Sequence, residues 1–128
     1  MKSSFLLAFL ALFCFFNFSL QQLAGGFTPM TVDEVEENPN AEEALQFGAN
    51  YVIAKLISKS VIPSGDAYSV SKIISAAQQV VAGVNYQFEA GISNEEGSMN
   101  FSAVYVVFRD LKGNQEVNFW GYIPPNSN

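Results

Sequence analysis

Apolar residues recur with two different periods along the chain, and the change of period separates a helical part from a strand-rich part. Leu45, Ala49, Val52 and Leu56 are spaced by four, three and four positions, which is the period of one helix face. From residue 68 onward, apolar and polar residues alternate, as they do in half-buried strands. The pattern therefore predicts one long helix followed by strands.

The helix is predicted to begin near Asn40, because Glu43 follows it at the spacing of a capping box. Phe47 and Tyr51 extend the apolar surface around the helix, so it needs cover on several sides. A curved sheet wrapped around the helix would provide that cover. Pro63 and the residues after it end the helical pattern.

Strands are predicted over about 68–77, 84–92, 99–108 and 117–123. The alternation slips at Lys72-Ile73-Ile74, which indicates a β-bulge in the first of them. The connections are too short to contain crossover helices. The sequence thus favours the α+β class with an antiparallel sheet.

The beginning of the chain has the layout of a secretory signal. Lys2 precedes an uncharged run from Phe5 to Phe16, which is shorter than the roughly 20 residues that a membrane-spanning helix needs. We expect a signal peptide over residues 1–21, cut between residues 19 and 24, with an uncleaved anchor as the alternative. We then expect no membrane association after cleavage, and secretion to the extracellular space or delivery to a lysosome-like vesicle lumen.

The rest of the chain, residues 22–128, has the length of a single domain. Residues 22–39 contain two glycines and two prolines and no sustained period, so they are predicted to be a mobile arm. Asn100-Phe101-Ser102 is an N-glycosylation sequon, which makes Asn100 a candidate acceptor in a secreted chain.

Composition argues against most catalytic chemistry. The sequence has no histidine, and its one cysteine, Cys14, lies in the apolar run that a signal peptidase would remove. The usual general base, thiol nucleophile and zinc ligands are then missing, so neither an enzyme, a metal site nor a cofactor is expected. The net charge of −6 would repel nucleic acids.

One turn has an unexpected composition. Gln79-Val80-Val81-Ala82-Gly83 lies where the first two strands must be connected, although such connections normally carry Gly, Asn, Asp, Ser or Pro. Taken alone, this apolar stretch could also be the end of a buried strand.

In this topological position, the stretch resembles the Q-x-V-x-G motif of the cystatins, inhibitors of papain-like cysteine proteases. Leu23-Ala24-Gly25 is similar to the family's N-terminal segment, and Leu111-Lys112-Gly113 stands where the stefin subgroup has its second hairpin turn. The first of these segments could instead be the end of the signal peptide. The second could be an ordinary turn. Trp120 is placed by the strand pattern inside the last strand, so no binding role is transferred to it.

The resemblance implies a stefin-like, disulfide-free domain in which an antiparallel sheet of four to five strands wraps around one long helix. It implies a monomer that binds papain-like proteases of the cathepsin type reversibly, through three segments that enter the active-site cleft. The implied contact residues are Leu23, Ala24, Gly25, Gln79, Val80, Val81, Ala82, Gly83, Leu111, Lys112 and Gly113. The alternative is a cystatin-fold binding module without protease inhibition.

Overall fold

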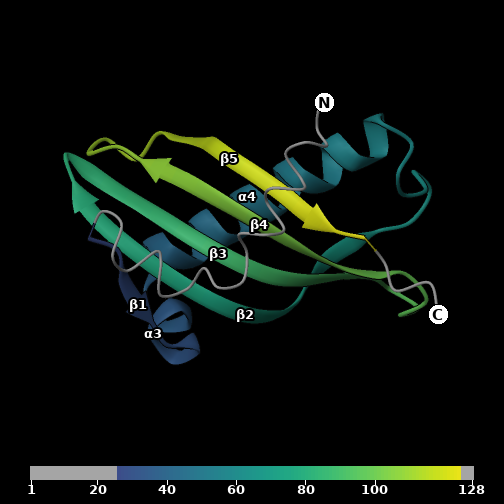
Figure 1. Ribbon diagram of the computed structural model, residues 1–128, viewed down its shortest axis with the longest axis horizontal. Helices are drawn as coiled ribbons and strands as arrows, with labels where there is room; N and C mark the ends of the chain where they lie inside the picture. The colour runs from purple at the N-terminus through teal and green to yellow at the C-terminus, as the bar shows by residue number, and fades with distance from the viewer. Residues whose placement is uncertain (1–25, 125–128) are drawn as a thin grey trace.

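The computed structural model describes residues 26–124, in which one antiparallel sheet wraps around one long helix (Figure 1). The sheet has five strands in the order β1-β2-β3-β4-β5. This confirms the predicted α+β architecture. The elements, in chain order, are β1 (Thr28–Met30), α3 (Val32–Glu37), α4 (Pro39–Ser58), β2 (Tyr68–Val81), β3 (Gly83–Asn94), β4 (Asn100–Arg109) and β5 (Gln115–Ile123).

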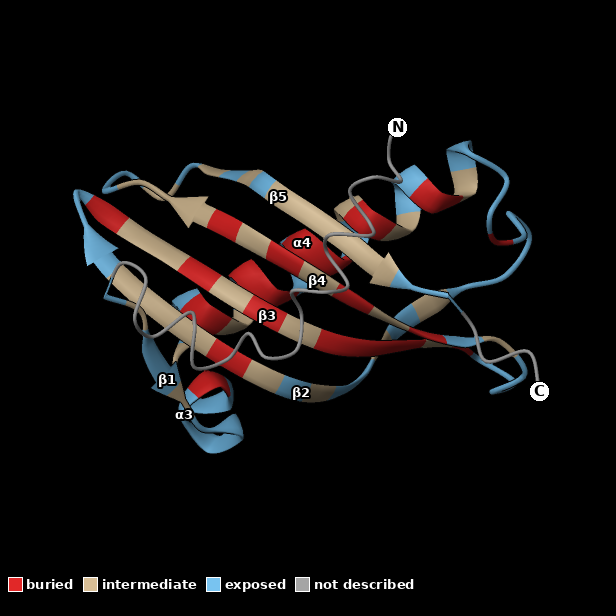
Figure 2. Cartoon of the chain, viewed as in Figure 1, coloured by how far each residue is buried: buried red, intermediate tan, exposed pale blue. Residues whose placement is uncertain are grey.

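The core lies between α4 and the inner face of the sheet (Figure 2). The helix buries the four residues of its predicted stripe, together with small residues such as Gly48. A Cβ at Gly48 would overlap the ring of Tyr105, so the glycine lets β4 approach the helix closely. The buried Tyr105 hydroxyl donates a hydrogen bond to the Leu45 carbonyl at 2.8 Å, and burial raises the pKa of this phenol. Helix and sheet are thus joined by packing and by a buried hydrogen bond.

The start of α4 differs from the prediction. Asn38, rather than Asn40, is the capping residue, because its side chain accepts hydrogen bonds from the backbone N–H groups of Asn40 and Ala41. Pro39 then occupies the first helical position, where its missing N–H costs nothing.

The segment expected to be an arm without regular structure contains β1 and α3. Thr31 and Glu34 form a capping box at the start of α3: Glu34 N–H donates to Thr31 Oγ1 at 3.1 Å, and Thr31 N–H donates to Glu34 Oε1 at 2.8 Å. Both elements are too short to show a sustained hydrophobic period. The prediction of an irregular segment is therefore corrected for residues 28–37.

Several strands extend further into their hairpin turns than predicted. β2 continues to Val81 instead of ending near Ala77, because its last residues stay paired with the start of β3. The predicted bulge in β2 is confirmed by register shifts between Val70 and Lys72 and between Ile73 and Ser75. Among residues 26–124, no helix is long and apolar enough to cross a membrane.

Candidate functional site

The tip of the β2–β3 hairpin is tight and apolar. Val81 pairs with Gly83 and Val80 pairs with Val84, so Ala82 alone lies outside the two strands. Val80 is 73% exposed and Val81 49% exposed, and Ala82 is exposed as well. The unusual turn composition noted in the sequence is thus a solvent-facing apolar surface, and the reading as a buried strand end is wrong.

Backbone pairing and two further contacts fix this first tip. Asn85 Nδ2 donates to Gln79 Oε1 across the hairpin at 2.9 Å. Gly83 has a φ of +118°, and a Cβ there would lie 2.6 Å from the carbonyl oxygen of Arg109. Glycine is required at this position both by the backbone conformation and by the close approach of β4.

The tip of the β4–β5 hairpin is a polar turn around the carboxylate of Asp110. Asp110 Oδ1 accepts hydrogen bonds from the backbone N–H groups of Asn114 at 2.8 Å and Lys112 at 2.9 Å. These bonds, that of Asn114 above all, lower the pKa of the Asp110 carboxyl. The turn presents Leu111, which is 84% exposed, at its outer end.

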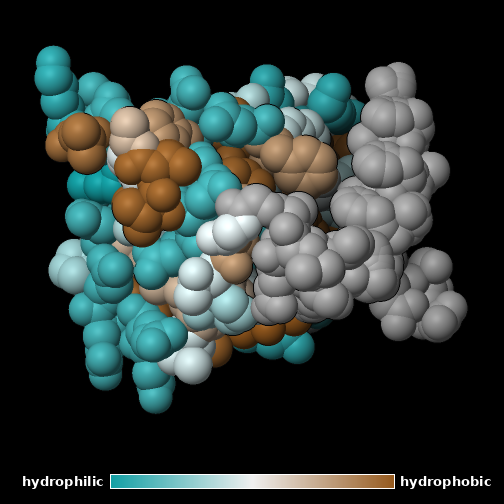
Figure 3. All heavy atoms as spheres, turned by 60° about the vertical axis from the view of Figure 1, so that its left-hand side comes forward, coloured by the Kyte–Doolittle hydropathy of each residue, from teal (hydrophilic) through white to brown (hydrophobic). Residues whose placement is uncertain are grey.

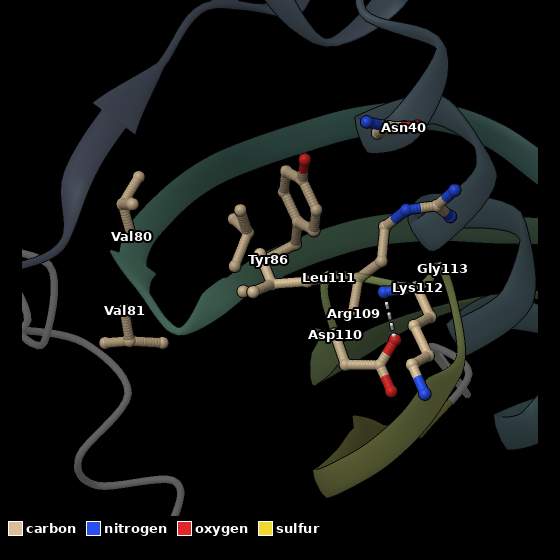
Figure 4. A pocket seen from close by; sticks show the side chains of 11 residues that line it. Asn40, Val80, Val81, Tyr86, Arg109, Asp110, Leu111, Lys112 and Gly113 are labelled. Atoms are coloured by element: carbon tan, nitrogen blue, oxygen red, sulfur yellow. Dashed lines mark hydrogen bonds between the residues drawn. The ribbon is translucent and has the colours of Figure 1, made fainter.

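The two tips lie side by side and share a shallow hollow of about 370 Å³ (Figure 4). Val80, Val81, Leu111 and Lys112 are among the residues that line it. Figure 3, in which this end of the molecule is turned forward, shows apolar side chains gathered among hydrophilic ones. The structure therefore brings together the two groups of residues that the sequence placed some thirty positions apart.

Arg109 connects the tips to the helix, a role that the sequence analysis did not find. Its Nη1 lies 2.6 Å from Glu43 Oε1 in the first turns of α4, and its carbonyl abuts Gly83. Its backbone also pairs with Val84 at the base of the first tip. No local sequence signal reveals this contact, because Arg109 and Glu43 are 66 positions apart.

Leu23, Ala24 and Gly25, which are predicted to be contact residues, lie outside the described residues. The register of β1 does show how the chain approaches the sheet: Thr28 pairs with Gln78 and Met30 with Ala76. Because the strands are antiparallel, the start of β1 is the end nearer to the tip of the β2–β3 hairpin.

Two other residues singled out from the sequence lie away from the tips. Trp120 is half-buried in β5, pairs with Tyr105 and packs against the core, as predicted from the strand pattern. Asn100 is exposed at the first position of β4, and the opposite end of that strand leads into the second tip.

The site presents exposed apolar side chains at both tips. Within the described part of the chain, no three His, Cys, Asp or Glu side chains are placed to hold a metal ion. The carboxylate of Asp110 is used by its own turn. Exposed apolar side chains on a rigid frame are suited to docking against another protein.

A helix wrapped by an antiparallel sheet, with two adjacent hairpin tips at one end, is the arrangement of the cystatin-like class of small α+β proteins. The model of the cystatin domain matches residues 34–119, and the chain belongs to the cystatin family. The match covers α4 and both tips. A comparison with curated proteins found no match. Cystatins are cysteine protease inhibitors rather than enzymes, and cysteine proteases are the partners that the family indicates.

Proposed function

We propose that this chain is a reversible, tight-binding inhibitor of papain-like cysteine proteases of the cathepsin type. In this proposal the two tips and the segment Leu23-Ala24-Gly25 enter the active-site cleft together. The observation that carries the proposal is the proximity of the two tips: Val80, Val81 and Leu111 are exposed around one hollow at one end of the five-stranded sheet.

Burial of these apolar side chains would supply much of the affinity. Fully burying one Val or Leu side chain is favourable by roughly 1.5–3 kcal/mol. The tips also have little conformational entropy to lose on docking, since Ala82 alone lies outside the strands of the first tip and Asp110 organises the second. In the proposed complex the tips fill the cleft as a wedge, and no peptide bond of the inhibitor is presented to the catalytic cysteine.

The direct test is Val81→Asp, measured as the inhibition constant against papain and a cathepsin-like protease. Placing a carboxylate on a surface that becomes buried is expected to weaken inhibition at least about tenfold. Val61→Asp is the matched control, because Val61 is also partly exposed at 36% but follows α4, away from the tips. Circular dichroism should show an intact fold for both variants.

The proposal fails if the unmodified mature chain, at micromolar concentration, leaves both proteases fully active. Such a result would leave a cystatin-fold binding module with another partner. Unchanged inhibition by Val81→Asp would instead remove the first tip from the mechanism.

The role of the N-terminal segment is tested by comparing two chains, one beginning at Leu23 and one at Gly26. The shorter chain lacks the three proposed contact residues and is expected to inhibit more weakly, with the same thermal stability. Equal inhibition constants would reduce the wedge to its two tips.

Secretion is a further part of the proposal, supported by the apolar run behind Lys2. Expression of the full chain in a secreting eukaryotic cell should deliver it to the medium, with an N-terminus between residues 20 and 25 on sequencing. Asn100 would then be the glycan acceptor: its side chain is exposed, and its Nδ2 donates a local hydrogen bond to the Gly97 carbonyl at 2.8 Å. Sensitivity of the secreted protein's mass to an amidase that removes N-glycans, lost in Asn100→Gln, tests this.

We propose that the inhibitor acts as a monomer, one molecule to each protease. Sedimentation of the free chain and of its complex with inactivated papain checks this, since a dimer would double both masses.

A further inference from the structure

The charged groups around the tips differ in the partners that their side chains have. Arg109 is paired with Glu43, and the carboxylate of Asp110 accepts hydrogen bonds from its own turn, including one from Asn114 Nδ2 at 3.2 Å. Lys112 is different. Among the described residues, no carboxylate lies within ion-pairing distance of its ammonium group, and the residue is exposed.

The backbone of Lys112 is fixed by its turn, although no ion-pair partner of its side chain is found among residues 26–124. Its backbone N–H donates to Asp110 Oδ1 at 2.9 Å, so the turn presents the lysine beside the exposed Leu111 (Figure 4). A positive charge therefore stands at the outer end of the second tip, on a chain that carries twice as many acidic as basic residues.

This placement bears on the choice of partner. A chain of net charge −6 is repelled overall by an acidic protein. An exposed cation that has no ion-pair partner among the described residues would locally attract carboxylates of a partner. Complementary charges at an interface mainly set which partner is accepted and how fast it associates.

We propose that Lys112 makes this inhibitor selective for papain-like proteases that carry carboxylates on the cleft wall reached by the β4–β5 tip. The inference rests on the proposed function and adds a preference among its targets. Leu111 supplies apolar contact to any such protease, whereas Lys112 distinguishes an acidic cleft wall from a neutral one.

The test uses one papain-like protease whose cleft wall carries Asp or Glu side chains, and a variant of it with the corresponding amides. Lys112→Met removes the charge and keeps a long side chain, Lys112→Arg keeps the charge, and Lys72→Met is the net-charge control on an exposed residue of β2. Inhibition constants are measured for all pairs at low and at high salt, which gives a double-mutant cycle across the interface.

At low salt, Lys112→Met should weaken inhibition of the acidic protease about fivefold and leave inhibition of the amide variant unchanged. High salt should remove the difference, because it screens exposed charges. Lys112→Arg and Lys72→Met should behave like the unmodified chain.

The proposed selectivity is overturned if the unmodified chain inhibits both proteases, but Lys112→Met and Lys72→Met change the inhibition constant of each protease equally. An unmodified chain that inhibits neither protease would overturn the proposed function, and the selection with it.

Discussion

The two tips stand side by side at one end of the sheet, yet they are held by different kinds of interaction. In the first, the strands pair up to Val81 and Gly83, and the backbone of β4 abuts the glycine. In the second, the turn from Asp110 to Asn114 is organised by hydrogen bonds to one carboxylate. The first tip therefore depends on close packing, and the second on polar contacts that remain open to water. Substitutions in the two tips should therefore differ in how strongly they weaken inhibition.

The largest difference is expected from alanine at the two tip glycines. Gly83→Ala places a side chain at φ +118° and against the Arg109 carbonyl, so inhibition of papain should weaken by about 5- to 150-fold, given roughly 1–3 kcal/mol of strain. Gly113→Ala also places a side chain at a positive φ, +94°, but its Cβ would meet only the Arg109 guanidinium at 3.4 Å, an ordinary contact, so this variant should cost less. Measuring the inhibition constants of both variants against papain tests whether Gly83→Ala weakens inhibition more than Gly113→Ala.

Gly97→Ala is the control for backbone strain alone. Gly97 has a φ of +78° in the β3–β4 turn, and nothing lies within 4 Å of the Cβ that would be added. This variant should lose some thermal stability and keep its inhibition constant. If Gly83→Ala inhibits as well as Gly97→Ala, close packing does not hold the first tip.

Much of the fold is visible in the sequence, because long elements repeat their pattern. The helix shows its buried stripe over several turns, and β3 and β4 alternate over most of their length. β1 and α3 span only three and six residues, too few for a period to emerge. The spacing of Thr31 and Glu34 was the available signal for α3, and it is the same capping pattern that was assigned wrongly to Asn40.

The site was predictable where a residue type contradicts its position. Val80 and Val81 are unusual in a turn, and this conflict points to a binding surface before any coordinates are known. The roles of Arg109 and Asp110 were not predictable in this way. The ion pair of Arg109 joins distant parts of the chain, and Asp110 is a common turn residue whose use as the acceptor for its own turn appears only in the folded geometry.

A second pair of variants compares the apolar contribution of each tip. Leu111→Ala removes three carbon atoms and Val80→Ala removes two, which at roughly 0.8 kcal/mol per buried carbon predicts weakening up to about 50-fold and 15-fold. Both residues are exposed in the free protein, so thermal stability should barely change. Val61→Ala, remote from the tips, is the control. An unchanged inhibition constant for Leu111→Ala would leave the first tip as the dominant contact.

Smaller effects should follow from the side-chain hydrogen bonds. Asn85→Ala removes the bond to Gln79 Oε1 at the base of the first tip, and Asn114→Ala removes the bond from Nδ2 to Asp110 Oδ2 in the second. One such bond contributes roughly 0.5–1.5 kcal/mol, so each variant should weaken inhibition by at most about tenfold. Asn85→Ala should have the smaller effect, because backbone pairing still holds its tip. The opposite order of inhibition constants would contradict the assignment of packing to the first tip.

The finest distinction is the response of the two tips to acid. Hydrogen bonds, first that from the Asn114 N–H, lower the pKa of Asp110 below its ordinary value of 3.8. The ionised carboxylate therefore stabilises the folded turn above pH 3.8, and this contribution is lost as the pH falls through the lowered pKa. Amide NMR signals of Lys112 and Asn114 should shift together only below pH 3.8, while those of Val81 and Gly83 stay in place. A midpoint at or above 3.8, or a joint shift of both tips, would show that the carboxylate does not hold the second tip by itself.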